Sequence, residues 1–234
     1  YTARMPVRKN LAASEIADQV LRAVEVLGEG ERIGNLVYMG MGEPLHNFDG
    51  VVGSFAPITD AAGLGYSPRK VTVSTSGLVP QIERLGRTAP VNLAISLNAS
   101  SDEVRDRIMP INRKYPIATL MDALRRYPLP PRRKMTIEYV LLGTVNDTDA
   151  DAHRLVKLLR GLPVRVNLIP WNPFQGPGFA RPADERVRSF QDILQRRGLT
   201  VTVRTTKGID IDAACGQLGE RPTAAEPRGG GGEA

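Results

Sequence analysis

Short apolar runs alternate with amphipathic segments along most of the chain. Six runs have the length and composition of strands, at residues 36–39, 70–77, 91–98, 135–142, 164–169 and 199–204. Between them, apolar residues recur at three- and four-residue spacing, which predicts helices at about 12–27, 48–62, 79–85, 117–127, 149–159 and 182–197, with a short one from about residue 101. Strands that alternate with helices predict βα units, and therefore a parallel sheet with right-handed crossovers.

The number of units decides between the parallel architectures. Six βα units are too few for a closed eight-stranded barrel, so we expect an α/β fold with a partial (β/α)6 barrel or a curved open sheet. The uninterrupted apolar run at 36–39 is typical of a strand that is covered on both faces. In such folds, ligand-binding groups gather at the carboxyl ends of the strands.

The first predicted strand runs into Gly40, Gly42, Glu43 and Pro44. Glycines at the end of a strand let a ligand approach the backbone closely, and the proline fixes the exit of the turn. A carboxylate beside exposed backbone carbonyls suits an ammonium group. A tight turn with a solvated glutamate explains the same residues, because short glycine motifs are weak signals.

Polar residues also end the next strands of the predicted sheet. They are Ser74 to Ser76 at the carboxyl end of the second strand, Ser96 and Asn98 at that of the third, and Asn172 after the fifth. Four strand ends with small polar or acidic residues favour a binding site more than any one of them does.

Composition narrows the class of protein. The length of 234 residues fits one large α/β domain or two small ones. No apolar run approaches the ~20 residues that cross a bilayer, and no signal peptide is evident, so we expect a cytoplasmic protein without membrane contact.

The net charge of +6 is compatible with a polyanionic partner such as RNA. The single cysteine, Cys215, excludes a disulfide framework and any all-cysteine metal site built from this chain alone.

The two ends of the sequence differ from the middle. The chain starts at Tyr1 rather than Met, which is typical of a fragment. From Arg221 on, Pro222, Pro227 and four consecutive glycines predict disorder. We therefore expect a catalytic domain at 1–219 and a disordered tail at 220–234.

Eight motifs in the same order carry a family resemblance. They are GMGEP at 40–44, VTVSTSG at 71–77, AISLN at 94–98, RIMPIN at 107–112, TIEYV at 136–140, VND at 145–147, NLIPWNP at 167–173 and DIDAACGQL at 210–218. Together they resemble the radical S-adenosylmethionine (SAM) adenine methyltransferases, which methylate C2 of an adenine in 23S rRNA and, in some members, in tRNA. The resemblance covers residues 2 to about 219, and the last motif is the most specific.

The resemblance implies a set of residues that contact SAM. Gly42 and Glu43 are similar to the segment that holds its methionine end, which agrees with the ammonium argument. The other implied contacts are Ser74, then Ser96, Leu97 and Asn98 on the third strand, and Asn172 after Trp171. Asn98 departs from the histidine often found there, although an amide also donates and accepts hydrogen bonds.

The resemblance also implies that Cys215 carries the methyl group. A thiolate takes a methyl group from a sulfonium, and in the family a 5′-deoxyadenosyl radical from a second SAM then attacks the methyl thioether. The resulting carbon radical adds to adenine C2, and another cysteine resolves the adduct. From the residue alone, a lone cysteine is more often a small buried apolar side chain.

One part of the family pattern is missing from the sequence. The family's CxxxCxxC triad, which holds a [4Fe–4S] cluster, would lie directly before Tyr1, so no metal ligand is assigned here and the ligands are expected in a preceding N-terminal part. The resemblance further implies an electron donor such as a flavodoxin and a monomeric enzyme. Two rivals stay open: a sister enzyme that methylates C8 of the same adenine, and a non-catalytic remnant.

Basic residues outside these motifs form two clusters, Arg113 with Lys114 and Arg132 to Lys134. Both are candidates for contact with RNA phosphates, and solvated loop charge explains them equally well. For Trp171, core packing beside Pro170 is the default, with stacking on a base as the alternative.

Overall fold

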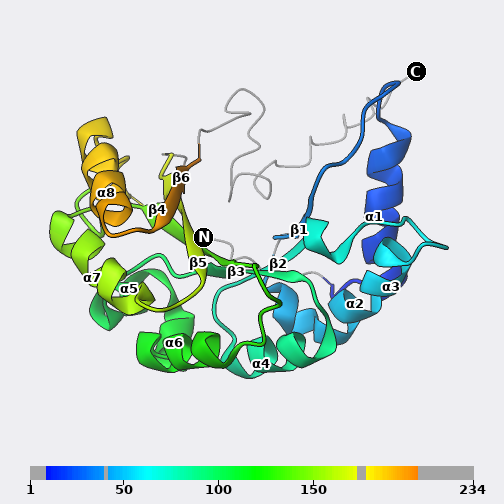
Figure 1. The fold of residues 1–234 in the computed structure, drawn as a ribbon, viewed down its shortest axis with the longest axis horizontal. Helices are drawn as coiled ribbons and strands as arrows, with labels where there is room; N and C mark the ends of the chain where they lie inside the picture. Colours follow the sequence, from blue (N-terminus) through cyan, green and yellow to red (C-terminus); the bar gives the residue numbers. More distant parts are fainter. Residues whose placement is uncertain (1–8, 40–41, 173–177, 205–234) are drawn as a thin grey trace, which may run out of the picture.

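Six strands form one parallel sheet in chain order (Figure 1). The structure is a computed structural model that describes residues 9–39, 42–172 and 178–204. The strands are β1 (Leu36–Tyr38), β2 (Val71–Thr75), β3 (Asn92–Ser96), β4 (Met135–Leu141), β5 (Val164–Pro170) and β6 (Thr200–Val203). Each is parallel to its neighbour. This six-stranded open sheet confirms the predicted α/β fold with a partial barrel.

Helices follow the strands and form an outer layer along one side of the curved sheet (Figure 1). The α-helices are α1 (Ala13–Glu25), α2 (Phe48–Gly53), α3 (Phe55–Thr59), α4 (Val79–Thr88), α5 (Asp102–Ile108), α6 (Ile117–Arg126), α7 (Asp149–Leu159) and α8 (Asp184–Arg196). In the described part of the chain, three short 3-10 helices lie between them: η2 (Pro44–Asn47), η3 (Pro68–Lys70) and η4 (Pro110–Arg113). None of the described helices is long and apolar enough to cross a membrane.

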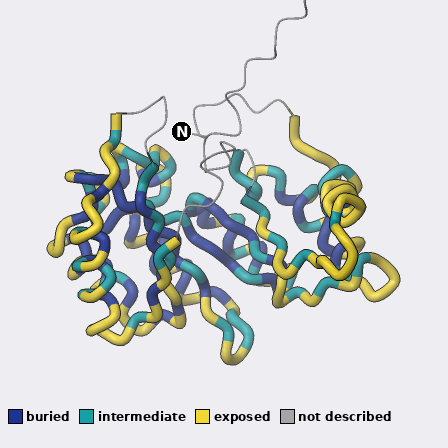
Figure 2. Tube along the Cα trace, turned by 90° about the horizontal axis from the view of Figure 1, so that it is seen from above, coloured by how far each residue is buried: buried dark blue, intermediate teal, exposed yellow. Residues whose placement is uncertain are grey.

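The two faces of the sheet have opposite chemistry. One face is apolar and buried under the helices, with a row that runs across the strands through Val73, Leu93, Met135 and Val164. The other face carries polar side chains at the alternate positions, and the strand register places Ser96, Glu138, Asn167 and Thr202 directly beside one another. Buried residues concentrate along the sheet and exposed ones in the outer turns (Figure 2). The polar face is therefore the one available to a ligand.

The prediction that the first strand is covered on both faces is wrong. Val37 is 51% exposed, and β1 has no fully buried residue. Val37 pairs with Thr72 and so belongs to the polar face, which the described helices leave open, and β1 is the edge strand of the sheet. An apolar run identified the strand correctly but gave the wrong environment for one of its two faces.

The helix predicted at 48–62 is broken into α2 and α3 at Ser54. Pro57 explains the break, because it has no N–H and its ring clashes with the carbonyl group four residues earlier, at Gly53. The hydroxyl of Ser54 donates to the carbonyl of Val51 at 2.7 Å, which satisfies an acceptor at the end of α2. The other predicted boundaries differ from the observed ones by three residues at most. Cys215 and the predicted disordered tail at 220–234 lie outside the described residues.

Candidate active site

Glu43 links the carboxyl ends of β1 and β2. One carboxylate oxygen, Oε2, accepts hydrogen bonds from the backbone N–H and the hydroxyl of Ser76, both at 2.7 Å. The other oxygen accepts from the backbone N–H of Leu45 at 3.1 Å, which caps η2. Gly42 precedes it with a φ of 108°, a conformation that side chains disfavour. The glutamate predicted as a binding residue is therefore held rigidly at the mouth of the sheet.

Glu138 lies on β4 in the middle of the polar face and is 7% exposed. Its Oε2 accepts from the hydroxyl of Ser74 at 3.2 Å and from that of Ser96 at 3.5 Å. Burial raises the pKa of Glu138, and the two serine hydrogen bonds and the charge of Arg204 partly oppose this rise. One buried carboxyl group thus holds together the predicted serines of β2 and β3.

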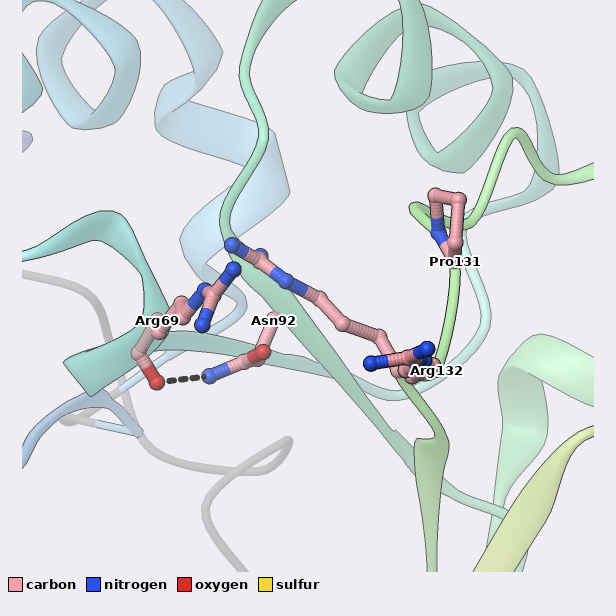
Figure 3. Close-up of a pocket in the computed structure, with 5 residues that line it drawn as sticks. Arg69, Asn92, Pro131 and Arg132 are labelled. Atoms are coloured by element: carbon pink, nitrogen blue, oxygen red, sulfur yellow. Dashed lines mark hydrogen bonds between the residues drawn. The ribbon is translucent and has the colours of Figure 1, made fainter.

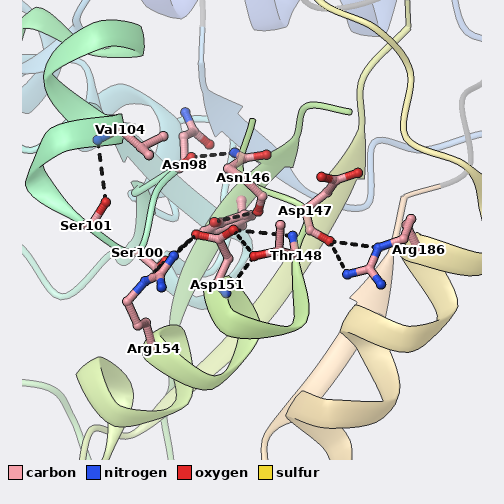
Figure 4. A network of polar contacts seen from close by, with 11 residues as sticks. Asn98, Ser100, Ser101, Val104, Asn146, Asp147, Thr148, Asp151, Arg154 and Arg186 are labelled. Atoms are coloured by element: carbon pink, nitrogen blue, oxygen red, sulfur yellow. Dashed lines mark hydrogen bonds and ion pairs between the residues drawn. The ribbon is translucent and has the colours of Figure 1, made fainter. Parts of the chain in front are cut away.

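Asn98 lies two residues beyond the end of β3 and has a left-handed conformation, with a φ of 58°. Its Oδ1 accepts from the backbone N–H of Val140 at 2.9 Å, and its Nδ2 donates to the sulfur of Met109 at 3.2 Å. The buried side chain of Asn146 donates to the carbonyl of Asn98 at 2.7 Å (Figure 4). It also donates to the carbonyl of Val140 at 2.8 Å. Asparagine tolerates this conformation better than most residues other than glycine, and Asn146 holds the backbone of Asn98 in it.

Leu97 lies beside Asn98 but faces the other way. Its side chain is fully buried, its N–H donates to the carbonyl of Glu138 at 3.0 Å, and its carbonyl accepts from Arg105 at 2.9 Å. The polar groups of Leu97 are thus already engaged. It shapes the end of the strand through its backbone.

Arg105 is a fully buried arginine behind the site. Its Nη2 donates to the carbonyl of Ser76 at 2.7 Å and its Nη1 to Asn112 Oδ1 at 2.9 Å. Burial lowers the pKa of Arg105 to about 10, and the charges of Asp102 and Asp106 oppose this effect. Arg105 remains a cation at neutral pH and ties the turn after β2 to the end of β3.

Gly77 completes this arrangement by its lack of a side chain. Its φ is 111°, and a Cβ atom there would lie 3.2 Å from Nη2 of Arg105 and 3.3 Å from a methyl carbon of Leu120. A glycine is therefore needed for both the turn and the close packing of the guanidinium.

The end of β5 supplies Trp171 and Asn172. The backbone N–H of Trp171 donates to the carbonyl of Leu141. The indole ring of Trp171 packs edge to face against the ring of Phe179, with a centroid distance of 6.1 Å. The Oδ1 of Asn172 accepts from Arg181 at 2.6 Å. These contacts favour packing for Trp171.

The structure thus joins most of the predicted strand-end residues into two connected groups. Glu43 and Ser76 form one, and Ser74, Ser96 and Glu138 form the other, with Arg105 behind both. Glu138 and Arg105 were not predicted as site residues. Glu138 is the one charged residue of the strand predicted at 135–142, which is a local signal that could have identified it, whereas nothing local distinguishes Arg105. Their roles depend on contacts between residues 29 and 64 positions apart.

The described residues contain no group of three or more His, Cys, Asp or Glu side chains that could hold a metal ion. An iron–sulfur cluster is bound by several cysteine thiolates, and these 234 residues include one cysteine. The residues of this chain do not fit such a cluster by themselves, and no chemical step is assigned to it below.

Comparison with known proteins agrees with the fold. The family model described as "Radical SAM superfamily" matches residues 5–156. The chain is 51% identical over 230 residues to a "Dual-specificity RNA methyltransferase RlmN" of Geobacter sulfurreducens, covering 98% of this chain and 63% of the relative. It is 53% identical over 214 residues to the protein of that name from Sorangium cellulosum, covering 91% and 55%. The chain spans about three fifths of the length of these curated relatives.

Solved structures with a similar fold include the following two. A radical SAM methyltransferase from Sphaerobacter thermophilus has a TM-score of 0.84 and 46% identity, covering 91% of this chain and 63% of that one. A domain of pyruvate-formate lyase-activating enzyme from Bacteroides vulgatus, at 18% identity and a TM-score of 0.57, covers 74% and 100% and supports the fold alone. The family match over residues 5–156 and the six-stranded parallel sheet together mean that this chain belongs to the radical SAM superfamily.

Proposed function

We propose that this chain is the catalytic domain of a SAM-dependent RNA methyltransferase. The observation that carries the proposal is the cluster of Glu43, Ser74, Ser76, Ser96 and Glu138 at one mouth of the sheet. About 50% identity to proteins named as RNA methyltransferases supports the reaction class.

Glu43 is suited to bind the ammonium group of the methionine moiety. A carboxylate offers about four lone-pair sites, and Ser76 and Leu45 use three of them in this structure. The remaining site is on Oε1. A charged N–H donor there would complete the coordination of a carboxylate whose position is already fixed.

The serines present a complementary surface. Each hydroxyl has one hydrogen, and Ser74 and Ser96 both donate theirs to Glu138. Toward a ligand they therefore act as acceptors, which suits ribose hydroxyl or amino donors. Asn98 keeps a second hydrogen on Nδ2 for a ligand acceptor. We propose Gly42, Leu97 and Asn172 as further contacts to SAM. Gly42 lets the ligand approach the backbone closely, and the backbone of Leu97 shapes the end of the third strand beside it.

We propose that Cys215 is the methyl carrier. In this step the thiolate forms a bond to the methyl carbon of SAM, the bond from that carbon to the sulfonium breaks, and S-adenosylhomocysteine leaves with the electron pair. The proposed acceptor of the methyl group is C2 of an adenine in 23S rRNA and in tRNA. The proposal includes a [4Fe–4S] cluster held by cysteines outside these residues, an electron donor such as a flavodoxin, and action as a monomer in the cytoplasm.

The test is nucleoside mass spectrometry of 23S rRNA and tRNA from cells with the gene, without it, and with the complete gene product restored. We expect 2-methyladenosine to disappear on deletion and to return with the wild type, but not with Cys215→Ala. The exposed-site variant His153→Gln is the control and restores the modification. Loss of 8-methyladenosine instead would assign the C8 reaction. Unchanged nucleosides in the deletion strain would contradict the methyltransferase assignment.

A further inference from the structure

A second site candidate lies at the opposite ends of the strands. A pocket of about 270 Å³ is lined by Arg69, Asn92, Pro131, Arg132 and Arg133. These residues precede or begin β2, β3 and β4, whereas Glu43 and Ser76 lie at the carboxyl ends. Figure 3 shows Asn92 between Arg69 and Arg132 in that view. The pocket is therefore separate from the site described above, by about 16 Å if β2 is taken as five extended residues.

The lining of this pocket is cationic and contains no carboxylate. Three of its five residues are arginines. Some surface arginines elsewhere in the described part of the chain, such as Arg84, Arg126 and Arg186, pair with acidic residues, and others such as Arg87 and Arg160 do not. Within the same described residues, Arg69 and Arg132 form no ion pair. Arg69 and Arg132 are exposed, so their two unpaired guanidinium groups form a positive surface beside the pocket that an anion can bind.

Two hydrogen bonds build the frame of the pocket. The amide of Asn92 donates to the carbonyl of Arg69 at 2.6 Å, which holds the end of η3 against the start of β3. Arg133 donates from Nη1 to the carbonyl of Pro90. The side chain of Arg133 therefore holds the loop before β3 in place, whereas the guanidinium groups of Arg69 and Arg132 are available to a ligand.

The backbone at Arg132 is in an unfavourable conformation. The N–H of Arg133 donates to the carbonyl of Pro130 at 3.1 Å, and Arg132 has a φ of 64°, which describes a turn with Pro131 and Arg132 at its centre. A positive φ at the third position of such a turn favours glycine or asparagine. An arginine here costs stability and places a cation at the pocket, which is the pattern expected of a binding residue.

We propose that this pocket binds a backbone phosphate of the RNA substrate. Planar guanidinium groups match phosphate oxygens, and an exposed pocket with donors from two chain segments suits a phosphodiester that passes over the surface. Lys70 and Lys134 flank the lining residues in sequence, and the chain carries a net charge of +6. The inference rests on the proposed function and adds a positioning contact at the end of the sheet away from SAM.

The experiment measures the affinity of the complete gene product for an RNA fragment that contains the target adenine, as a function of salt. Arg69→Gln with Arg132→Gln should weaken binding about tenfold at low salt. It should also reduce the slope of log affinity against log salt by about 0.7–0.9, the value for one lost phosphate contact. Arg22→Gln with Arg188→Gln, on the outer faces of α1 and α8, removes the same charge and should leave both values nearly unchanged.

A second variant separates binding from folding. Arg132→Gly relieves the positive φ, so its thermal stability should equal or exceed that of the wild type while its RNA affinity falls. Loss of both would mean that Arg132 has a structural role and would overturn the proposal.

Two other outcomes would also overturn it. One is unchanged RNA affinity and salt slope in the double glutamine variant. The other is that inorganic phosphate stabilises the wild type but not the double glutamine variant, while the two proteins bind RNA equally well. That result would assign the pocket to free phosphate. A wild-type protein that binds RNA through the arginines without methylating it would reject the proposed function and leave this inference standing.

Discussion

At the scale of single residues, Glu138 is the centre of the polar face. It is buried, it accepts from two serines of neighbouring strands, and its pKa is raised chiefly by desolvation. A carboxyl group in this position holds Ser74 and Ser96 in fixed rotamers. The cost is a charge kept out of water.

That cost is measurable as a dependence of stability on pH. The folded state binds the proton of Glu138 more tightly than the unfolded state, whose ordinary pKa is 4.5. The free energy of unfolding should therefore fall as the pH rises from about 4.5 through the raised pKa, and then level off. Glu138→Gln removes this term, so the stability of the variant relative to the wild type should increase over that range.

Urea unfolding of both proteins without SAM, from pH 4.5 to 8, checks this prediction. Glu185→Gln is the control, since that glutamate is exposed at the start of α8. A difference between Glu138→Gln and the wild type that is constant or decreases with pH would show that desolvation of this carboxyl group is not the dominant effect.

At the scale of elements, the strands have one face in the core and one on the polar side of the sheet. Val37 and Val73 illustrate this on adjacent strands: Val37 is 51% exposed on the polar face, and Val73 is fully buried on the helix-covered face. The same chemical change should therefore have different effects at the two positions.

We predict that Val37→Thr changes the free energy of unfolding by less than about 0.5 kcal/mol. Val73→Thr should lower it by about 1–3 kcal/mol, because it buries a hydroxyl group in an apolar layer. Urea denaturation of the two variants measures the difference. Equal losses at both positions would indicate that the polar face of β1 is covered in solution.

Hydrophobic periodicity predicted the identity and order of the strands and most of the helices, because burial under one helical layer repeats along each element. Hydrophobic periodicity did not predict features that depend on a single residue or on the whole sheet. Pro57 divides the helix at 48–62, and the position of Val37 depends on which face of the sheet the helices cover. The second of these is a property of the whole sheet, and a strand's own sequence does not contain it.

At the scale of the whole molecule, the parallel sheet separates two regions along the strands. The carboxyl ends collect Glu43, Ser74, Ser76 and Ser96, which strand-end polarity predicted from the sequence. The amino ends collect the arginine pocket, of which the sequence showed only the cluster at 132–134. Arg69 joins that cluster through the pairing of β2 with β3, a contact between distant segments that no local pattern reveals.

The same limit applies to the residues behind the site. Arg105 and Asn146 hold the ends of β2, β3 and β4 together through hydrogen bonds to backbone carbonyls. Every residue type has a backbone carbonyl, so the sequence alone does not predict which carbonyls Arg105 and Asn146 contact. Polar strand ends were readable because their chemistry lies in their own side chains.

The central claim is that these strand ends receive a sulfonium nucleotide with its ammonium group at Glu43. Calorimetric titration of SAM into the complete gene product tests it directly, with Glu43→Gln against the exposed control Glu185→Gln. We expect Glu43→Gln to weaken SAM binding at least about tenfold, the effect of losing one charge-assisted hydrogen bond, with no change for the control. Wild-type affinity for SAM in a correctly folded Glu43→Gln protein would contradict the account.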